Sequence, residues 1–239
     1  MMKKKPSKNR MKQFNLDETF RQLRTNIEFS QFDTQMKVIN IVSTNPNEGK
    51  STVASNLARI YSAKYDHILL IDCDLRNATL HKYLGISNAR GLSDFLAHFE
   101  LDTNIKEYKE LQTVHEEDLN SSFQVLTAGS RVPNPQELLS SLKFVNFLKQ
   151  ARKEFDMVII DCPPCMAVSD AIPVCNASDG TLYVISAKDT DKKMAREAIA
   201  ELNRNGANII GAVLTKAEDV ASRRYYYYGE GYGEHRDEE

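Results

Sequence analysis

A short loop between an apolar run and a helical pattern carries the residue types that bind phosphate. The loop, Ser43-Thr-Asn-Pro-Asn-Glu-Gly-Lys-Ser-Thr52, follows the run Val38–Val42. In such a loop the backbone N–H groups and the helix N-terminus surround an anion, Lys50 reaches the β and γ phosphates, and the Ser51 hydroxyl ligates Mg²⁺. The position between strand and helix favours a nucleotide site over a plain turn with a helix cap, although Thr44 replaces the first glycine of the usual motif. The predicted nucleotide-binding residues are Asn47, Glu48, Gly49, Lys50, Ser51 and Thr52.

Three aspartates follow two other apolar runs. One run ends in Ile71 and continues as Asp72-Cys-Asp74, and another ends in Ile160 and continues as Asp161. Ligands of an open parallel sheet bind outside the carboxyl ends of its strands, so these carboxylates are expected beside the phosphate loop. A single acid at a strand end is usually a cap, but three around a phosphate loop are better explained as Mg²⁺ ligands and a base. Since side chains alternate along a strand, Asp72 and Asp74 face the same side, and one can hold metal while the other meets a nucleophile.

The arrangement of apolar runs predicts how these residues are positioned. Short runs rich in Ile and Val alternate with segments long enough for helices, which is typical of a doubly wound α/β fold with a mostly parallel sheet flanked by helices. The segment Glu100–Asn120 is polar and acidic, and we expect an irregular or helical excursion there. The predicted strands are Val38–Val42, Ile68–Ile71, Phe123–Leu126, Met157–Ile160, Thr181–Ile185 and Ile209–Leu214. The predicted helices are Asp17–Ser30, Lys50–Lys64, Pro135–Lys153 and Thr190–Asn205.

Composition and charge restrict the class of protein. The chain has 239 residues and a formal net charge of −2, which indicates an ordinary globular protein and argues against binding nucleic acid over a broad basic face. The first twelve residues hold six cations and no acid, and the last eleven hold five acids, so both ends are expected to be solvated tails. A basic arm can also rest on an anionic membrane, but a solvated tail is favoured. No apolar run reaches the roughly 18 residues of a membrane span, and we expect a cytoplasmic protein.

Four cysteines lie in or beside apolar runs, as expected in a reducing compartment. Cys162-Pro-Pro-Cys165 has the spacing of a metal or redox pair, but it lacks a second pair or nearby histidines. Small core side chains are the favoured interpretation, and a metallocluster carrier is a weak alternative.

Taken together, the motifs resemble those of the bacterial tyrosine kinases (BY-kinases) that accompany capsule and exopolysaccharide synthesis. The resemblance rests on the phosphate loop, Asp72-x-Asp74-x-Arg76, Asp161-x-Pro163-Pro164, and Pro133-Asn-Pro-x-Glu-Leu-Leu139, and it covers about residues 17–232. It implies the P-loop class that includes partition and septum-site ATPases. It also implies ATP and Mg²⁺ as cofactors.

The resemblance also implies roles for single residues. Lys50 and Ser51 correspond to the phosphate and Mg²⁺ contacts, Asp74 and Asp161 to the metal-binding acids, and Asp72 to the residue that takes the tyrosine proton. Arg76 is either structural or close to the phosphates. Asn47 stands where the family usually has Gly, and it tolerates a left-handed backbone better than other residues. Thr215 stands where relatives often have Asn, which leaves the adenine contacts open.

Near the N-terminus, Glu18-x-x-Arg21-x-x-Arg24 matches the family's E-x-x-R-x-x-R element. Spacings of three and six place these groups on one helical stripe. The resemblance implies contacts between neighbouring copies that close a ring, commonly an octamer; the alternative is a solvated helical face.

A tyrosine cluster follows the last predicted strand. Its residues show neither an α nor a β period, and three glycines interrupt it, so a core element is excluded. A stacking arm for nucleic acid is disfavoured by the nearby acids, and a partner-binding motif remains possible. We predict phosphoacceptors at Tyr225, Tyr226, Tyr227, Tyr228 and Tyr232.

The sequence therefore predicts a basic arm (1–16), a P-loop kinase domain (17–218, with an oligomerisation helix at 17–31) and a flexible tyrosine-rich tail (219–239). The expected activity is ATP-dependent tyrosine phosphorylation, including trans-autophosphorylation of the tail. The resemblance implies a membrane-embedded activator that recruits the protein to the inner face of the cell membrane, and an opposing phosphatase. No nucleic-acid partner is expected. The alternative is a partition or positioning ATPase that transfers phosphate only to water.

Overall fold

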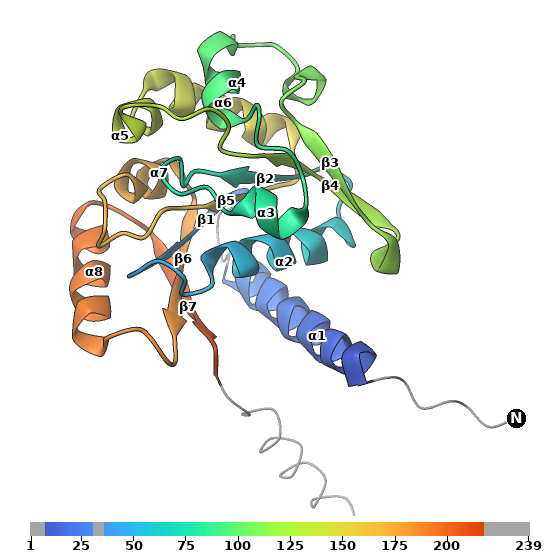
Figure 1. The fold of residues 1–239 in the computed structure, drawn as a ribbon, viewed down its shortest axis with the longest axis vertical. Coiled ribbons are helices and arrows are strands. Elements are labelled where there is room, and N and C mark those ends of the chain that lie inside the picture. The colour runs from blue at the N-terminus through green and yellow to red at the C-terminus, as the bar shows by residue number, and fades with distance from the viewer. Residues whose placement is uncertain (1–7, 31–35, 218–239) are drawn as a thin grey trace, which may run out of the picture.

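A seven-stranded sheet forms the centre of the computed structural model, which describes residues 8–30 and 36–217 (Figure 1). The strand order is β3-β4-β2-β5-β1-β6-β7, and all neighbours are parallel except β3 and β4. The strands are β1 (Val38–Ser43), β2 (Ile68–Asp72), β3 (Gln112–Glu116), β4 (Ser121–Leu126), β5 (Met157–Asp161), β6 (Gly180–Ser186) and β7 (Ile209–Thr215). The doubly wound α/β fold predicted from the sequence is confirmed.

Helices cover both faces of the sheet, and strand residues alternate between two apolar cores. Val38 and Val42 pack into the core beneath α4 to α8, whereas Ile39 and Ile41 pack into the core beneath α1 to α3. Every residue of β1, β2 and β5 is buried, which explains their unbroken apolar sequence. The helices are α1 (Lys8–Phe29), α2 (Lys50–Ser62), α3 (Leu80–Leu84), α4 (Leu92–His98), α5 (Pro135–Leu139), α6 (Leu142–Glu154), α7 (Ala171–Ala177) and α8 (Lys192–Arg204).

Two element predictions need correction. The segment Glu100–Asn120 contains strand β3, which pairs antiparallel with β4 at the edge of the sheet, as well as two short 3₁₀ helices. The residues of β3 are at best half-buried, so this strand lacks the apolar character of the central strands. The single helix predicted at Pro135–Lys153 is two helices, because Ser141 interrupts it and caps α6 by accepting a hydrogen bond from the Phe144 N–H.

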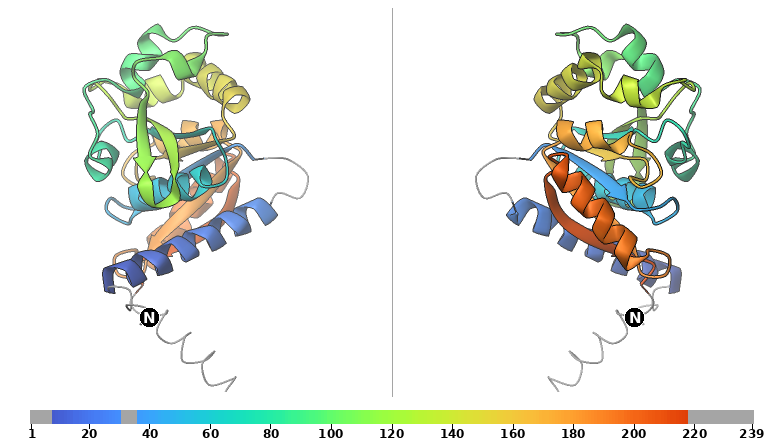
Figure 2. Two further views of the ribbon diagram at one scale, coloured as in Figure 1. Left: turned by 90° about the vertical axis from the view of Figure 1, so that its right-hand side faces the viewer. Right: turned by 90° about the vertical axis from the view of Figure 1, so that its left-hand side faces the viewer.

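Helix α1 begins at Lys8, well before the predicted Asp17, so the helix includes part of the segment predicted as a basic arm. It packs on α2 as the outermost helix of its face (Figure 2). Phe20 and Ile27 enter the core, and Arg59 of α2 forms ion pairs with Asp17 of α1 and with Glu116 at the end of β3. Among the described residues, no helix combines the length and apolar character required to cross a bilayer.

The core on the α4 and α6 side is rich in aromatic rings. The Phe147 ring lies 4.8 Å from that of Phe95 and 5.8 Å from that of Phe99, measured between centroids. All three side chains are almost completely excluded from solvent. This cluster packs α6 against α4, and α6 also contacts β5, which carries Asp161 at its end.

Phe147→Ala is expected to lower the free energy of unfolding by about 3–5 kcal/mol, because it removes a buried ring and leaves a cavity. Urea denaturation followed by circular dichroism measures the change. Lys149→Ala, on the exposed side of the same helix, should change stability by no more than about 0.5 kcal/mol. A loss below about 1 kcal/mol for Phe147→Ala would contradict the packing described here.

Candidate active site

The phosphate loop joins β1 to α2 through two residues with left-handed backbone. Asn47 has φ 62° and Gly49 has φ 103°. Asn47 therefore adopts the conformation that the sequence predicted it would tolerate. At Gly49 the positive φ favours glycine, and a Cβ atom would make a tight contact of 3.2 Å with Thr215 Cγ2. The first N–H groups of α2, which lack partners within the helix, are the ready-made anion donors of this loop.

Hydrogen bonds of Glu48, which the sequence did not predict, hold the loop in place. The Glu48 side chain is fully buried; it accepts hydrogen bonds from the Asn45 N–H at 3.0 Å and from the Thr190 hydroxyl at 2.6 Å. The Thr215 hydroxyl donates to the Glu48 carbonyl. Of the predicted nucleotide-binding residues, Glu48 can therefore offer only its backbone. Its partners outside the loop, Thr190 and Thr215, lie 142 and 167 positions away, so no local sequence signal indicates them.

The predicted catalytic acids lie together at the carboxyl ends of adjacent strands. Asp72 ends β2, Asp161 ends β5, and the two residues are paired in register. Both are almost entirely inaccessible to solvent. Asp72 Oδ1 accepts the Asp74 N–H at 3.0 Å, whereas Asp72 Oδ2 and Asp161 Oδ1 are buried and have no hydrogen-bond partner among the described residues.

Buried carboxyl groups without donors are neutralised either by a proton or by a bound cation, and this donor set fits Mg²⁺. Burial, followed by the neighbouring charge of Asp161, raises the pKa of Asp72 well above its usual range. Burial also raises the pKa of Asp161, while a hydrogen bond with Ser51 and the charge of Lys50 act in the opposite direction. Ser51, Lys50 and Asp161 thus form one electrostatic unit. The protein residues alone leave that unit short of positive charge.

Asp74 lies in a pocket that opens above the phosphate loop. The pocket has a volume of about 430 Å³ and is lined by Asn47, Gly49, Lys50, Ser51 and Thr52 from the loop, and by Asp74, Asn77, Thr79, Lys82 and Tyr83 on the other side, with Pro46 at its edge. Asp74 Oδ1 accepts the Asn77 N–H at 3.0 Å. The structure therefore brings Asp74 and all the predicted loop residues except Glu48 to one cavity. Asp72 and Asp161 do not line it, but Asp72 is hydrogen-bonded to the backbone of Asp74, and Asp161 interacts with Ser51.

Arg76 has a structural partner. Its guanidinium forms a bidentate ion pair with Asp170, with Nε–Oδ2 2.6 Å and Nη2–Oδ1 3.0 Å. The Asp170 side chain is 2% exposed. The pair joins the segment after β2, which carries Asp74, to the segment after β5, which follows Asp161. Planar, two-bond pairs of this kind fix geometry as well as charge.

The predicted oligomerisation residues differ in their surroundings. Arg21 and Glu18 pair loosely with each other, N–O 3.7 Å, and both are exposed. Arg24 instead donates from Nη1 to the Ile60 carbonyl of α2 at 2.8 Å. Among the described residues, Arg24 thus bonds to another helix, whereas Glu18 and Arg21 pair with each other within α1.

The cysteine pair shows no sign of a metal site within the described residues, which contain no metal-ligating group of three. Cys162 is buried and Cys165 is half-buried. Burial raises the pKa of the Cys165 thiol to about 11. The tail tyrosines Tyr225, Tyr226, Tyr227, Tyr228 and Tyr232 fall outside the described residues.

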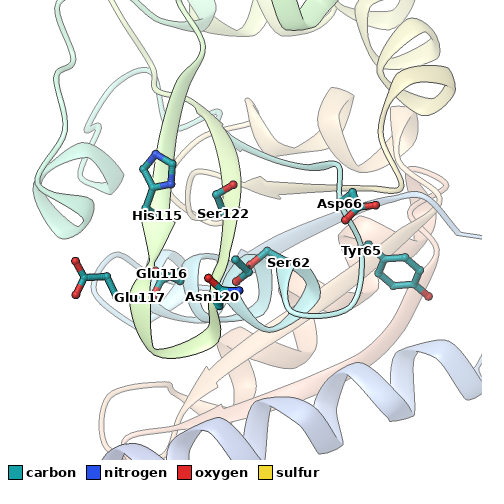
Figure 3. Close-up of a pocket in the computed structure, with 9 residues that line it drawn as sticks. Ser62, Tyr65, Asp66, His115, Glu116, Glu117, Asn120 and Ser122 are labelled. Carbon is teal, nitrogen blue, oxygen red and sulfur yellow. The ribbon is translucent and has the colours of Figure 1, made fainter.

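A second cavity of about 440 Å³ lies near the amino ends of β2 and β4 and contains none of the predicted site residues (Figure 3).

Comparison with known proteins places this geometry in a family. The model of the AAA domain family matches residues 36–210. The tyrosine-protein kinase YwqD of Bacillus subtilis (strain 168) is 39% identical over 212 residues, which are 89% of this chain and 86% of the relative. The chain belongs to the bacterial tyrosine kinases. As a member of this family it is a P-loop protein-tyrosine kinase, and the relatives favour this class over the partition-ATPase alternative.

Solved structures agree with this assignment. The kinase domain of the Escherichia coli tyrosine kinase ETK is 32% identical, with a TM-score of 0.73, over 85% of this chain and 78% of that chain. The chimerical protein CapA2B2 is also 32% identical, with a TM-score of 0.72, over 82% of this chain and 83% of that chain. The P-loop fold shared by these proteins indicates nucleotide binding.

Gly49→Ala is expected to weaken ATP binding by about tenfold or more, because the positive φ strains alanine and the added Cβ presses on Thr215, which together move the N–H groups that surround the phosphates. Isothermal titration calorimetry measures the affinity. Gly85→Ala is the matched control, since Gly85 also has a positive φ, of 66°, but no atom lies within 4 Å of its added Cβ. The control should lose about 1 kcal/mol of stability and keep its affinity for ATP. Equal loss of affinity in both variants would contradict the proposed contact.

Proposed function

We propose that this protein transfers the γ-phosphoryl group of ATP to tyrosine hydroxyls, including those of its own tail in a neighbouring copy. The observation that supports this most directly is the pair of buried carboxyl groups with unpartnered oxygens, Asp72 and Asp161, beside Lys50 and Ser51. A site of this kind both requires a divalent cation and offers a base close to the phosphates.

Each residue of the site has a distinct task in this proposal. The phosphate-loop N–H groups and the Lys50 ammonium bind the β and γ phosphates and neutralise charge that develops during transfer. Ser51, Asp74 and Asp161 would hold Mg²⁺, which supplies further charge neutralisation when bound. Asp72 accepts the proton of the tyrosine hydroxyl as the new oxygen–phosphorus bond forms and the bond to ADP breaks. For the rate of transfer, the position of Asp72 matters more than a strongly raised pKa of its carboxyl group, because the transition state is loose.

The tail is the proposed acceptor because it combines several tyrosines with small residues. Five tyrosines and three glycines lie between Tyr225 and Gly233. Because glycine has only a hydrogen atom as its side chain, these residues add little bulk beside the tyrosines that must enter an active site. Each phosphorylation adds about −1.5 to −2 charge to a tail that already ends in acids.

The assembly and the partners are proposed on the family's pattern. Exposed Glu18 and Arg21 would exchange their loose internal pair for contacts with a neighbouring copy in a ring of eight copies. A membrane-embedded activator would recruit the protein to the inner face of the membrane, and a phosphotyrosine phosphatase would reverse the modification. The setting would be the synthesis and export of capsular or extracellular polysaccharide.

Incubation with ATP and Mg²⁺, alone and with the cytoplasmic segment of a candidate activator, should produce phosphotyrosine that an antibody detects. Lys50→Met and Asp72→Asn are expected to reduce the initial rate by about a hundredfold or more, because they remove phosphate binding and the proton acceptor. Lys149→Met, at an exposed position of α6, should retain the wild-type rate. Absence of phosphotyrosine in the wild type under both conditions would sink the kinase proposal.

Replacement of the five tail tyrosines by phenylalanine identifies the acceptor and tests the assembly. This variant should bind ATP normally and lose autophosphorylation. Its mass in size-exclusion chromatography with light scattering should be the same before and after incubation with ATP. The wild type should have a lower mass when phosphorylated than after phosphatase treatment, because roughly −6 to −10 of added charge on several tyrosines repels the tail from the acidic site and loosens the ring. Identical masses would contradict the proposed link between phosphorylation and assembly.

A further inference from the structure

One wall of the nucleotide pocket has features that the transfer chemistry alone does not use. We name it the α3 rim, formed by Asn77, Thr79, Lys82 and Tyr83. It is tied to both sides of the predicted metal site, because the Asp74 carboxylate accepts the Asn77 N–H and the Thr79 hydroxyl lies 3.4 Å from that of Ser51. A group that approaches the γ-phosphate beside Ser51 and Asp74 therefore passes this rim.

The rim places a positive charge at the mouth of the pocket. Among the pocket's lining residues, the charged side chains are those of Lys50, Asp74 and Lys82; Lys50 is buried and Asp74 half-buried, while Lys82 is exposed. Several other exposed lysines, such as Lys64 and Lys216, pair with carboxylates of described residues, and Lys82 has no such pair in the described ranges. Its ammonium is thus available to an incoming acidic group.

An aromatic ring lies beside this charge. Tyr83 is 52% exposed, and its hydroxyl accepts a hydrogen bond from Asn56 Nδ2 at 3.2 Å. The hydrogen bond holds the ring at the pocket mouth, where it can pack against another aromatic side chain. A cation and an aromatic ring together suit a segment that is both acidic and aromatic.

The chain carries such a segment in its tail. Residues 229–234 read Gly-Glu-Gly-Tyr-Gly-Glu, so glycine alternates with Glu230, Tyr232 and Glu234. In an extended chain these three side chains point to the same side, and neighbours two residues apart are about 7 Å apart. With the Tyr232 hydroxyl at the γ-phosphate, a flanking carboxylate is therefore within reach of the rim.

We propose that the α3 rim is the acceptor-docking surface, where Lys82 pairs with the glutamates flanking Tyr232 in the tail of a second copy while Tyr83 packs against tyrosine rings. This inference rests on the proposed kinase function and adds the substrate class, a tyrosine flanked by acidic residues. The transfer itself is unchanged: the Tyr232 oxygen gains the phosphoryl group, ADP leaves, and the hydroxyl proton passes to Asp72.

A peptide of residues 223–239, with Tyr225 to Tyr228 changed to phenylalanine, makes Tyr232 the single acceptor. A second peptide also carries Glu230→Gln and Glu234→Gln. Initial rates are measured with the full chain whose five tail tyrosines are phenylalanine, under the conditions that give phosphotyrosine in the wild type. The acidic peptide should have a KM roughly three- to fivefold below that of the neutral peptide, as expected for a solvent-exposed charge pair.

Lys82→Ala should raise the KM for the acidic peptide by the same factor and leave the neutral peptide, kcat and the KM for ATP unchanged. Lys149→Ala, an exposed lysine on α6, is the control and should change none of these values. Lys82→Glu should prefer a peptide in which both glutamates are lysine. Tyr83→Ala should raise the KM for both peptides, whereas Tyr83→Phe, which keeps the ring, should have a smaller effect.

Two outcomes would overturn this docking surface. An equal effect of Lys82→Ala on both peptides would show that charge pairing with the acceptor is absent, and an increased KM for ATP would place Lys82 on the nucleotide. Neither outcome touches the kinase proposal, which fails only if no tyrosine is phosphorylated in any peptide or in the wild-type tail.

Discussion

The burial of two carboxyl groups on adjacent strands is the constraint on which the site depends. Asp72 and Asp161 end β2 and β5 in register, and each has a buried oxygen without a hydrogen-bond donor among the described residues. Charges in such surroundings are costly unless they are compensated. Lys50 and Ser51 provide part of that compensation for Asp161. A bound cation would provide the rest, and this is why the proposed Mg²⁺ site is placed at these two carboxyl groups.

The phosphate loop is equally dependent on distant residues. Its backbone takes two left-handed positions, at Asn47 and Gly49, and the buried Glu48 side chain holds the loop to Thr190 after β6. Thr215, at the end of β7, closes against the same loop through its hydroxyl and methyl groups. The last strand before the tyrosine-rich segment therefore supports the loop that binds phosphate. The Arg76–Asp170 pair supports the opposite side of the site in a similar way.

Local sequence patterns were informative where burial is complete. The strands β1, β2 and β5 are buried on both faces, so their apolar runs identified them and placed the aspartates at their carboxyl ends. Strand β3 was not predicted because it lies at the sheet edge, where half-buried Gln112 and Glu116 and exposed His115 produce no apolar run. The break between α5 and α6 was also missed, since the two serines there are compatible with either a helix or a cap until the packing of each helix is known.

The fold class follows from the sequence, because complete burial of a strand produces a local apolar run. The phosphate loop and the aspartates at the strand ends are predictions of the same local kind. The partners of the residues around the site depend on the tertiary structure, in which Glu48 is buried against Thr190, Arg76 pairs with Asp170 and Arg24 contacts α2. The physical reason is that these partners lie far apart in the sequence, from a few dozen to more than a hundred positions. Such hydrogen bonds and ion pairs form only when helices and strands pack together, and no local pattern records that packing.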